Sequence, residues 1–183
     1  MKKTAILFAS GYEEVEALTV VDLLRRAKIG CDIISVADSG QVTGSHGISI
    51  GADRNFSGTD FRQYDAVILP GGMPGTTNLA ADERVIELLH SFSAAGKLTA
   101  AICAAPTVLA KAGLLEGRKA VCYPGMEGQL TGAKVSFEPV AVDGTVITSR
   151  GLGTAIEFAL SIVQYFEGKE RAEALASSVV YRE

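Results

Sequence analysis

The 183-residue sequence has no tryptophan, only two histidines and only three cysteines. Cys31, Cys103 and Cys122 form no CxxC pair, so their spacing indicates neither a zinc site nor a disulfide framework, and no metal is expected. No run approaches the roughly 18 apolar residues that a membrane-spanning helix needs. The net charge of -4 argues against nucleic acid or an anionic membrane as the main partner.

The first residues, MKKTAILFAS, resemble a secretory signal only briefly. Their apolar part is shorter than a signal peptide requires, and residues 11–16 read as structure. Free thiols are also typical of a reducing compartment. We therefore expect a cytoplasmic protein.

The composition, 48% hydrophobic and 21% charged, is that of a globular protein, and the length favours one domain over residues 1–183. Hydrophobic patterns predict buried strands at 3–9, 31–36, 66–69 and 98–102, helices at 13–27, 75–95, 104–112, 154–166 and 169–180, and small hairpins at 41–50 and 140–148. This alternation predicts an α/β fold with a mostly parallel, doubly wound sheet and helices on both faces. Ligands of such sheets bind beyond the carboxyl ends of the strands, which here gathers the loops 10–16, 70–72, 103–104 and 149–153.

Cys103 stands where the strand at 98–102 gives way to an alanine-rich helix. A nucleophile elbow uses the same strand-turn-helix arrangement to expose its side chain, with the next backbone amide, here that of Ala104, facing the reacting group. The alternative is that Cys103 is simply buried, as free cysteines often are and as we expect for Cys31 and Cys122. Pro106 suits the first turn of a helix starting at Ala104, whose positive end would face the sulfur.

Four motifs, GYEEVEA, LPGG, AAICAAP and SRGLGTAIEFAL, occur in an order and spacing that resemble the DJ-one branch of the ThiJ/PfpI superfamily. The resemblance spans nearly the whole chain. It implies a flavodoxin-like fold, a homodimer and no cofactor. It also implies activity as a glyoxalase or deglycase on methylglyoxal, glyoxal or their early adducts, or alternatively a role as an oxidative-stress sensor or chaperone.

The resemblance further assigns roles to four residues. Cys103 matches the reactive cysteine, Glu16 the protonated glutamate that hydrogen-bonds to it, and the amides of Gly72 and Ala104 an oxyanion pocket. Without the resemblance, Glu16 could merely complement a helix dipole, the role that we expect for Glu13 and Glu14.

Weaker substrate-contact candidates are Gly71, Tyr123, His46 and Arg26. Tyr123 stands where relatives often have a histidine, which argues against a Cys-His dyad, and His46 stands at the position of an anion-binding arginine. Arg26 matches a second arginine of that region. His90 lies on a predicted helix and is expected at the surface. Nucleic acid is expected only as a deglycation substrate.

The chemistry requires an anionic sulfur, since a free thiol with a pKa near 8.5 is only a few per cent ionised at pH 7. A helix N-terminus and a nearby donor both favour the thiolate, and a pKa lowered by about 2 to 3 units would make it dominant. Burial of Glu16 beside a thiolate should raise the pKa of that carboxyl.

Two further questions stay open at this level. The superfamily includes intracellular cysteine peptidases, which carry a histidine directly after the cysteine, whereas this chain has Ala104 and so lacks a group to protonate the leaving amine. Arg150 begins the loop before a long helix, and it could reach either the site or a neighbouring subunit.

Overall fold

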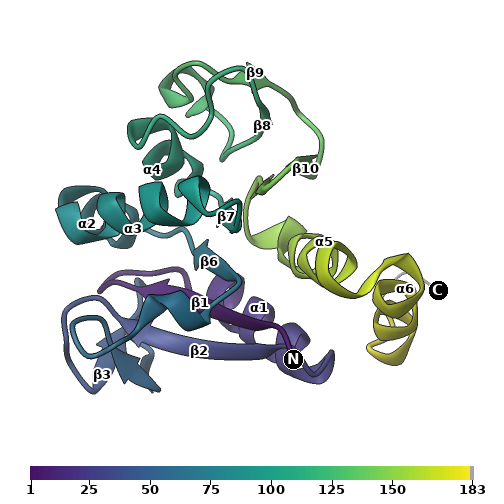
Figure 1. The fold of residues 1–183 in the computed structure, drawn as a ribbon, viewed down its shortest axis with the longest axis horizontal. Coiled ribbons are helices and arrows are strands. Elements are labelled where there is room, and N and C mark those ends of the chain that lie inside the picture. The colour runs from purple at the N-terminus through teal and green to yellow at the C-terminus, as the bar shows by residue number, and fades with distance from the viewer. Residues whose placement is uncertain (182–183) are drawn as a thin grey trace.

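The computed structural model describes residues 1–181, and its centre is a seven-stranded sheet with the order β10-β11-β7-β6-β1-β2-β5 (Figure 1). Its strands are β1 (Lys3–Phe8), β2 (Gly30–Ser35), β5 (Arg54–Asn55), β6 (Ala66–Leu69), β7 (Leu98–Ile102), β10 (Val140–Asp143) and β11 (Val146–Ser149). Every neighbouring pair is parallel except β10 and β11, which form the expected hairpin with its turn at Gly144 and Thr145. The predicted flavodoxin-like α/β fold is confirmed.

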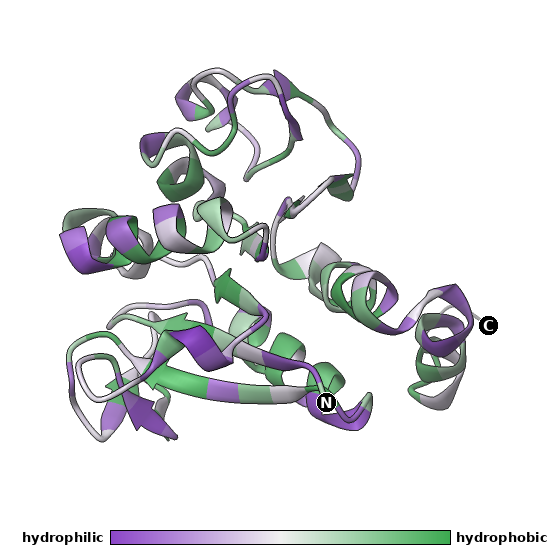
Figure 2. Ribbon diagram, in the orientation of Figure 1, coloured by the Kyte–Doolittle hydropathy of each residue, from purple (hydrophilic) through white to green (hydrophobic). Residues whose placement is uncertain are grey.

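Side chains alternate between the two faces of the sheet. In β1, Ile6 and Phe8 join the core under α1 (Glu14–Arg26) and α5 (Ala155–Glu167). Ala5 and Leu7 of the same strand join the opposite core, which is covered by α2 (Gly75–Ala81), α3 (Glu83–Ala94) and α4 (Pro106–Lys111). In Figure 2, β6 is largely hydrophobic, and the helices carry both hydrophobic and hydrophilic segments. The central strands β1, β6, β7 and β11 are thus buried on both faces, as parallel strands usually are, whereas the edge strands β5 and β10 are partly exposed.

The remaining elements lie at the periphery. They are the hairpin β3 (Gln41–Thr43) and β4 (Ser49–Gly51), the pair β8 (Lys119–Ala120) and β9 (Lys134–Val135), the terminal helix α6 (Lys169–Ser178) and three 3-10 turns, Phe61–Gln63, Glu127–Gln129 and Leu152–Thr154. No helix within residues 1–181 is both long and apolar enough to cross a membrane.

Two predicted helices differ from those observed. The helix expected over 75–95 is divided at Asp82, whose carboxylate accepts the Arg84 amide at 2.9 Å and caps α3, because aspartate favours a helix start over a helix interior. The helix expected from Ala104 begins at Pro106 and has only six residues. The strands β5, β8 and β9, of two residues each, were not predicted, since such short segments carry no hydrophobic period.

Candidate active site

Cys103 follows directly after β7 at the carboxyl edge of the sheet and has a positive φ of 65°. This conformation is uncommon for a residue with a side chain and is costly unless its surroundings enforce it. Two backbone bonds do so: the Cys103 amide donates to the Ser149 carbonyl at 3.0 Å, and its carbonyl accepts the Tyr123 amide at 2.7 Å. The side chain is half-buried, so the alternative of a fully buried cysteine is wrong for Cys103 and right for Cys31 and Cys122.

The loop after β6 supplies two amides to the site. The Gly72 amide, together with that of Ala104, donates a hydrogen bond to the Cys103 sulfur. The Gly71 amide donates to the Glu16 carboxylate at 3.0 Å. A Cβ on Gly71 would lie 2.5 Å from the Cys103 Cβ and 2.6 Å from Glu16 Oε2, so only glycine fits between these two side chains.

Glu16 lies in the first turn of α1 with 1% of its surface exposed, and it hydrogen-bonds to the Cys103 thiol. Its position is fixed from the other side by Glu13, whose carboxylate accepts the Glu16 amide at 2.7 Å and caps the helix. The residues Cys103, Glu16, Gly71, Gly72 and Ala104, taken from three loops, therefore meet as the sequence predicts.

Burial raises the pKa of Glu16 to about 7, although the hydrogen bond from Cys103 acts to lower this pKa. Burial and the adjacent Glu16 carboxylate raise the pKa of the Cys103 thiol to about 12, although the Ala104 and Gly72 amides act in the opposite direction. The prediction that the helix N-terminus and a nearby donor lower the pKa of the Cys103 thiol is therefore wrong. The short α4 does not outweigh burial and the neighbouring carboxylate, and Cys103 and Glu16 titrate as a coupled pair.

A cavity of about 370 Å³ opens in front of the sulfur. Its walls are Gly72, Met73, Cys103, Ala104, Tyr123, Pro124, Gly125 and Met126. The predicted position of Tyr123 at the site is thus observed, in the wall of this cavity. Met73 and Met126 were not predicted, because methionine carries no recognisable catalytic chemistry and the region after 113 shows no regular pattern.

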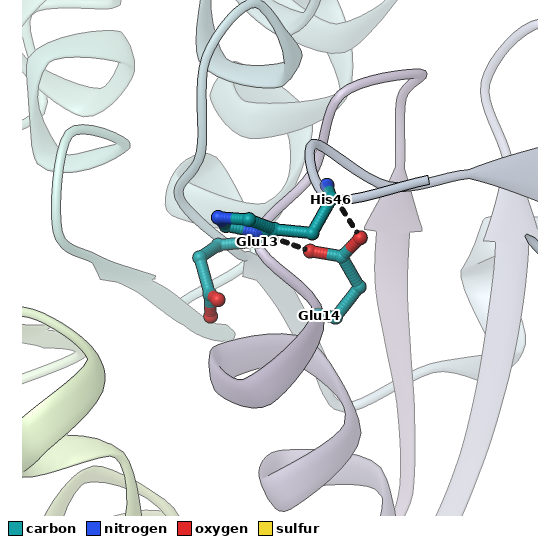
Figure 3. A group of neighbouring side chains, drawn as sticks. All are labelled: Glu13, Glu14 and His46. Atoms are coloured by element: carbon teal, nitrogen blue, oxygen red, sulfur yellow. Dashed lines mark hydrogen bonds and ion pairs between the residues drawn. The ribbon is translucent and has the colours of Figure 1, made fainter. Parts of the chain in front are cut away.

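Glu14 has a different role from the expected one of complementing the helix dipole. It is 3% exposed and accepts the His46 amide at 2.7 Å and the His46 ring Nδ1 at 2.9 Å (Figure 3). Burial acts to raise the pKa of Glu14, but the hydrogen bonds from His46 and from the Ile48 amide outweigh it and lower the pKa to about 2. His46, whose side chain is 71% exposed, serves with Glu14 to fasten the β3–β4 hairpin to α1.

Glu13, Glu14 and His46 also hold potential metal-ligand atoms within 4.8 Å of one another (Figure 3). The Glu14 oxygens accept donors from the hairpin, and a Glu13 oxygen accepts the Glu16 amide. These hydrogen bonds explain why the three side chains lie together: they form a structural clasp between the β3–β4 hairpin and α1.

Glu14→Gln is expected to destabilise the protein by about 1 to 3 kcal/mol, because it removes the negative charge that strengthens the hydrogen bonds from the His46 and Ile48 amides and from the His46 ring. The folded pKa of about 2 lies below the usual 4.5, so the carboxylate contributes stability above pH 4.5 that is lost as pH falls through 2. Urea unfolding at pH 7 and pH 3 measures both effects, with Glu87→Gln on the exposed side of α3 as control. Equal stability of Glu14→Gln and wild type at pH 7 contradicts the clasp.

Arg26 is not part of the site. It follows Glu16 by ten residues on α1, which is about 15 Å along a helix, and its guanidinium pairs with Asp22 at 2.7 Å on the exposed surface. His90 is exposed, as expected, and its Nε2 contacts the Ala112 carbonyl at 2.8 Å. His46 contacts Glu14 and His90 contacts the Ala112 carbonyl, so neither histidine forms a Cys-His dyad with Cys103.

These features define a flavodoxin-like α/β protein with a strained cysteine at a nucleophile elbow and a buried acid beside it. The chain belongs to the DJ-1/PfpI family, whose model matches residues 2–165.

Individual relatives agree with this assignment. Protein dj-1beta of Drosophila melanogaster is 38% identical over 181 residues, covering 98% of this chain and 97% of that protein. The glutathione-independent glyoxalase DJR-1.2 of Caenorhabditis elegans is 36% identical over 166 residues, covering 89% of this chain and 87% of that one. The solved structure of oxidized DJ-1 from Toxoplasma gondii superimposes with a TM-score of 0.96 at 36% identity, covering 100% of both chains.

Proposed function

We propose that this protein is a cysteine-dependent, cofactor-independent glyoxalase that acts on methylglyoxal, glyoxal or their early adducts. The observation that carries the proposal is the pair of Cys103 and Glu16, in which Cys103 lines a cavity, Glu16 is buried behind it, and the amides of Gly72 and Ala104 favour the anionic sulfur. The glyoxalase DJR-1.2, similar over most of its length, supports the same reaction class.

The reaction begins when the Cys103 proton moves to Glu16 and the thiolate attacks the aldehyde carbon of the substrate. The new alkoxide oxygen of the hemithioacetal accepts hydrogen bonds from the backbone amides of Gly72 and Ala104. Glu16 returns the thiol proton to this alkoxide and is again a carboxylate. It then takes the proton from the first carbon and gives it to the second, while the hydroxyl proton moves from the first oxygen to the second, which converts the hemithioacetal into a thioester of the 2-hydroxy acid. Water hydrolyses the thioester, so that methylglyoxal and one water yield lactate and the free thiol.

The test is lactate formation from methylglyoxal by the purified protein without added cofactor, with Cys103→Ala as its control. Many lactate molecules per protein molecule are expected. No lactate above the uncatalysed rate contradicts the proposal.

The second candidate is a redox sensor or chaperone in which Cys103 is oxidised to the sulfinic acid. The half-buried sulfur and the similarity to a DJ-1 structure described as oxidized favour it. Intact mass after peroxide treatment, set beside the lactate assay, separates a stoichiometric responder from a catalyst. A peptidase is less well supported, because Ala104 occupies the position that a histidine would need.

We also propose that the chain, residues 1–183, is one domain that forms a cytoplasmic homodimer. Val15 on α1 and Ile48 on the β3–β4 hairpin are 48% and 54% exposed, and the clasp of Glu14 and His46 holds these two elements together. All three cysteines are free, as in reducing compartments. Light scattering is expected to give twice the chain mass of 19.1 kDa, and a mass of one chain contradicts the dimer.

A further inference from the structure

A second cavity of about 370 Å³ lies next to the Cys103 cavity. It is lined by Tyr123, Pro124, Phe137, Pro139, Arg150 and residues 151–154. Tyr123 and Pro124 line both cavities and form the wall between them. The two cavities are therefore neighbours, and Tyr123 is half-exposed where they meet.

The backbone ties the second cavity to the reacting groups. Ser149, the residue before Arg150, accepts the Cys103 amide at 3.0 Å. A Cβ placed on Gly151, the residue after Arg150, would lie 3.5 Å from the Tyr123 ring and 3.9 Å from Glu16 Oε1. The loop that carries Arg150 therefore begins at a residue hydrogen-bonded to the Cys103 backbone and passes close to Glu16 and Tyr123.

Arg150 gives the second cavity its charge. The half-buried guanidinium lies 5.9 Å from the Phe137 ring centre and reaches the Phe137 carbonyl at 3.4 Å. Within residues 1–181 no carboxylate forms an ion pair with it, and the nearby Glu138 is paired with Lys119 at 2.6 Å. Residues 152–154 lead directly into α5, so the cavity also lies at the positive end of that helix.

We propose that this second cavity is a subsite for the carrier part of a 2-oxoaldehyde adduct, and that Arg150 selects carriers bearing a carboxylate. The proposal rests on the proposed function and deepens it. The aromatic and proline walls suit the apolar stem of a carrier, while a guanidinium matches a carboxylate in charge and in hydrogen-bond geometry. The substrate class is then the hemithioacetal that methylglyoxal forms with a carboxylate-bearing thiol.

The transfer step balances without any redox partner. The bond between the aldehyde-derived carbon and the carrier sulfur breaks, and the carrier leaves as a thiol with the proton that Glu16 received from Cys103. The Cys103 sulfur forms the new bond to the same carbon, and the resulting hemithioacetal proceeds to lactate as above. Arg150 retains the carrier during the exchange and does not take part in it.

The experiment compares two carriers at the same free methylglyoxal concentration, 3-mercaptopropionate and the neutral 2-mercaptoethanol. For the wild type, kcat/KM with the anionic carrier is expected to exceed that with the neutral one by about tenfold, the usual scale for a charge-assisted hydrogen bond. Arg150→Gln is expected to bring this ratio to about one, and Arg150→Lys to retain part of it. The matched control is Arg62→Gln. Arg62 precedes β6, at the amino ends of the parallel strands, whereas Arg150 follows β11 at their carboxyl ends, so this variant should keep the wild-type ratio.

Binding without chemistry makes the result independent of the proposed function. The stable thioether S-acetonyl-3-mercaptopropionate is titrated calorimetrically into Cys103→Ala protein and into the Cys103→Ala, Arg150→Gln double variant. A Kd about tenfold weaker in the double variant supports the subsite even if no lactate forms. Equal rates with both carriers in an active wild type, or equal Kd values in the two variants, overturn the subsite and leave the glyoxalase proposal intact.

Discussion

Cys103→Ala is expected to reduce lactate formation from methylglyoxal at least about a thousandfold, to the uncatalysed rate, since loss of the nucleophile removes the covalent route altogether. Alanine keeps the backbone, so the Gly72 and Ala104 amides remain in place but find no sulfur. Steady-state lactate measurement over a range of methylglyoxal concentrations checks the effect. Activity of the variant within tenfold of the wild type contradicts the mechanism.

The control for this variant is structural. Cysteine and alanine both carry a Cβ, so the positive φ of 65° is equally uncommon for each, and the thermal midpoint should change little. Cys103→Ser adds a second comparison: its hydroxyl retains the contact with Glu16, but its proton is far harder to remove than that of a thiol. Serine should therefore be as inactive as alanine, which separates a need for thiolate from a need for any hydrogen-bond donor.

The location of the site followed from sequence because parallel strands bring their carboxyl ends to one edge. Cys103, Gly71 and Glu16 follow three such strands, β7, β6 and β1, and their convergence needs only the strand assignment. The family resemblance added what spacing alone could not, namely that Glu16 and not Glu13 or Glu14 is the acid at the sulfur.

The errors came from groups whose behaviour depends on three-dimensional surroundings. Glu14 looks like any acidic residue in a first turn, and only the folded hairpin brings His46 to it. The thiol pKa depends on burial and on the charge of Glu16, neither of which a motif encodes. The cavity walls at Met73, Met126 and Phe137 come from irregular segments, which lack a period to follow.

Glu16→Gln is expected to lose activity and gain stability at the same time. Glutamine preserves the shape, can accept the Gly71 amide and can donate to the sulfur, but it cannot accept the Cys103 proton or move one between carbons. General acid-base groups contribute about 10² to 10⁴ in rate, so kcat should fall by that factor. The wild-type rate should rise with pH through about 7, where burial places the pKa of Glu16, and the variant should lack this rise.

The stability gain follows from the raised pKa of Glu16. Its folded pKa of about 7 lies above the usual 4.5, so the folded protein holds this proton more tightly than the unfolded chain does. The contribution of Glu16 to stability is therefore greatest below pH 4.5 and is lost as pH rises to about 7, a change of about 3 kcal/mol for this one group. Glu16→Gln removes the loss and should be the more stable protein at pH 8, by urea unfolding, whereas Glu87→Gln at the surface should not. The fold disfavours the ionised Glu16 carboxyl, whereas the proposed chemistry needs it. A Glu16→Gln variant that is less stable than the wild type at pH 8 therefore contradicts the buried acid. A variant that is as active as the wild type contradicts the proton transfer.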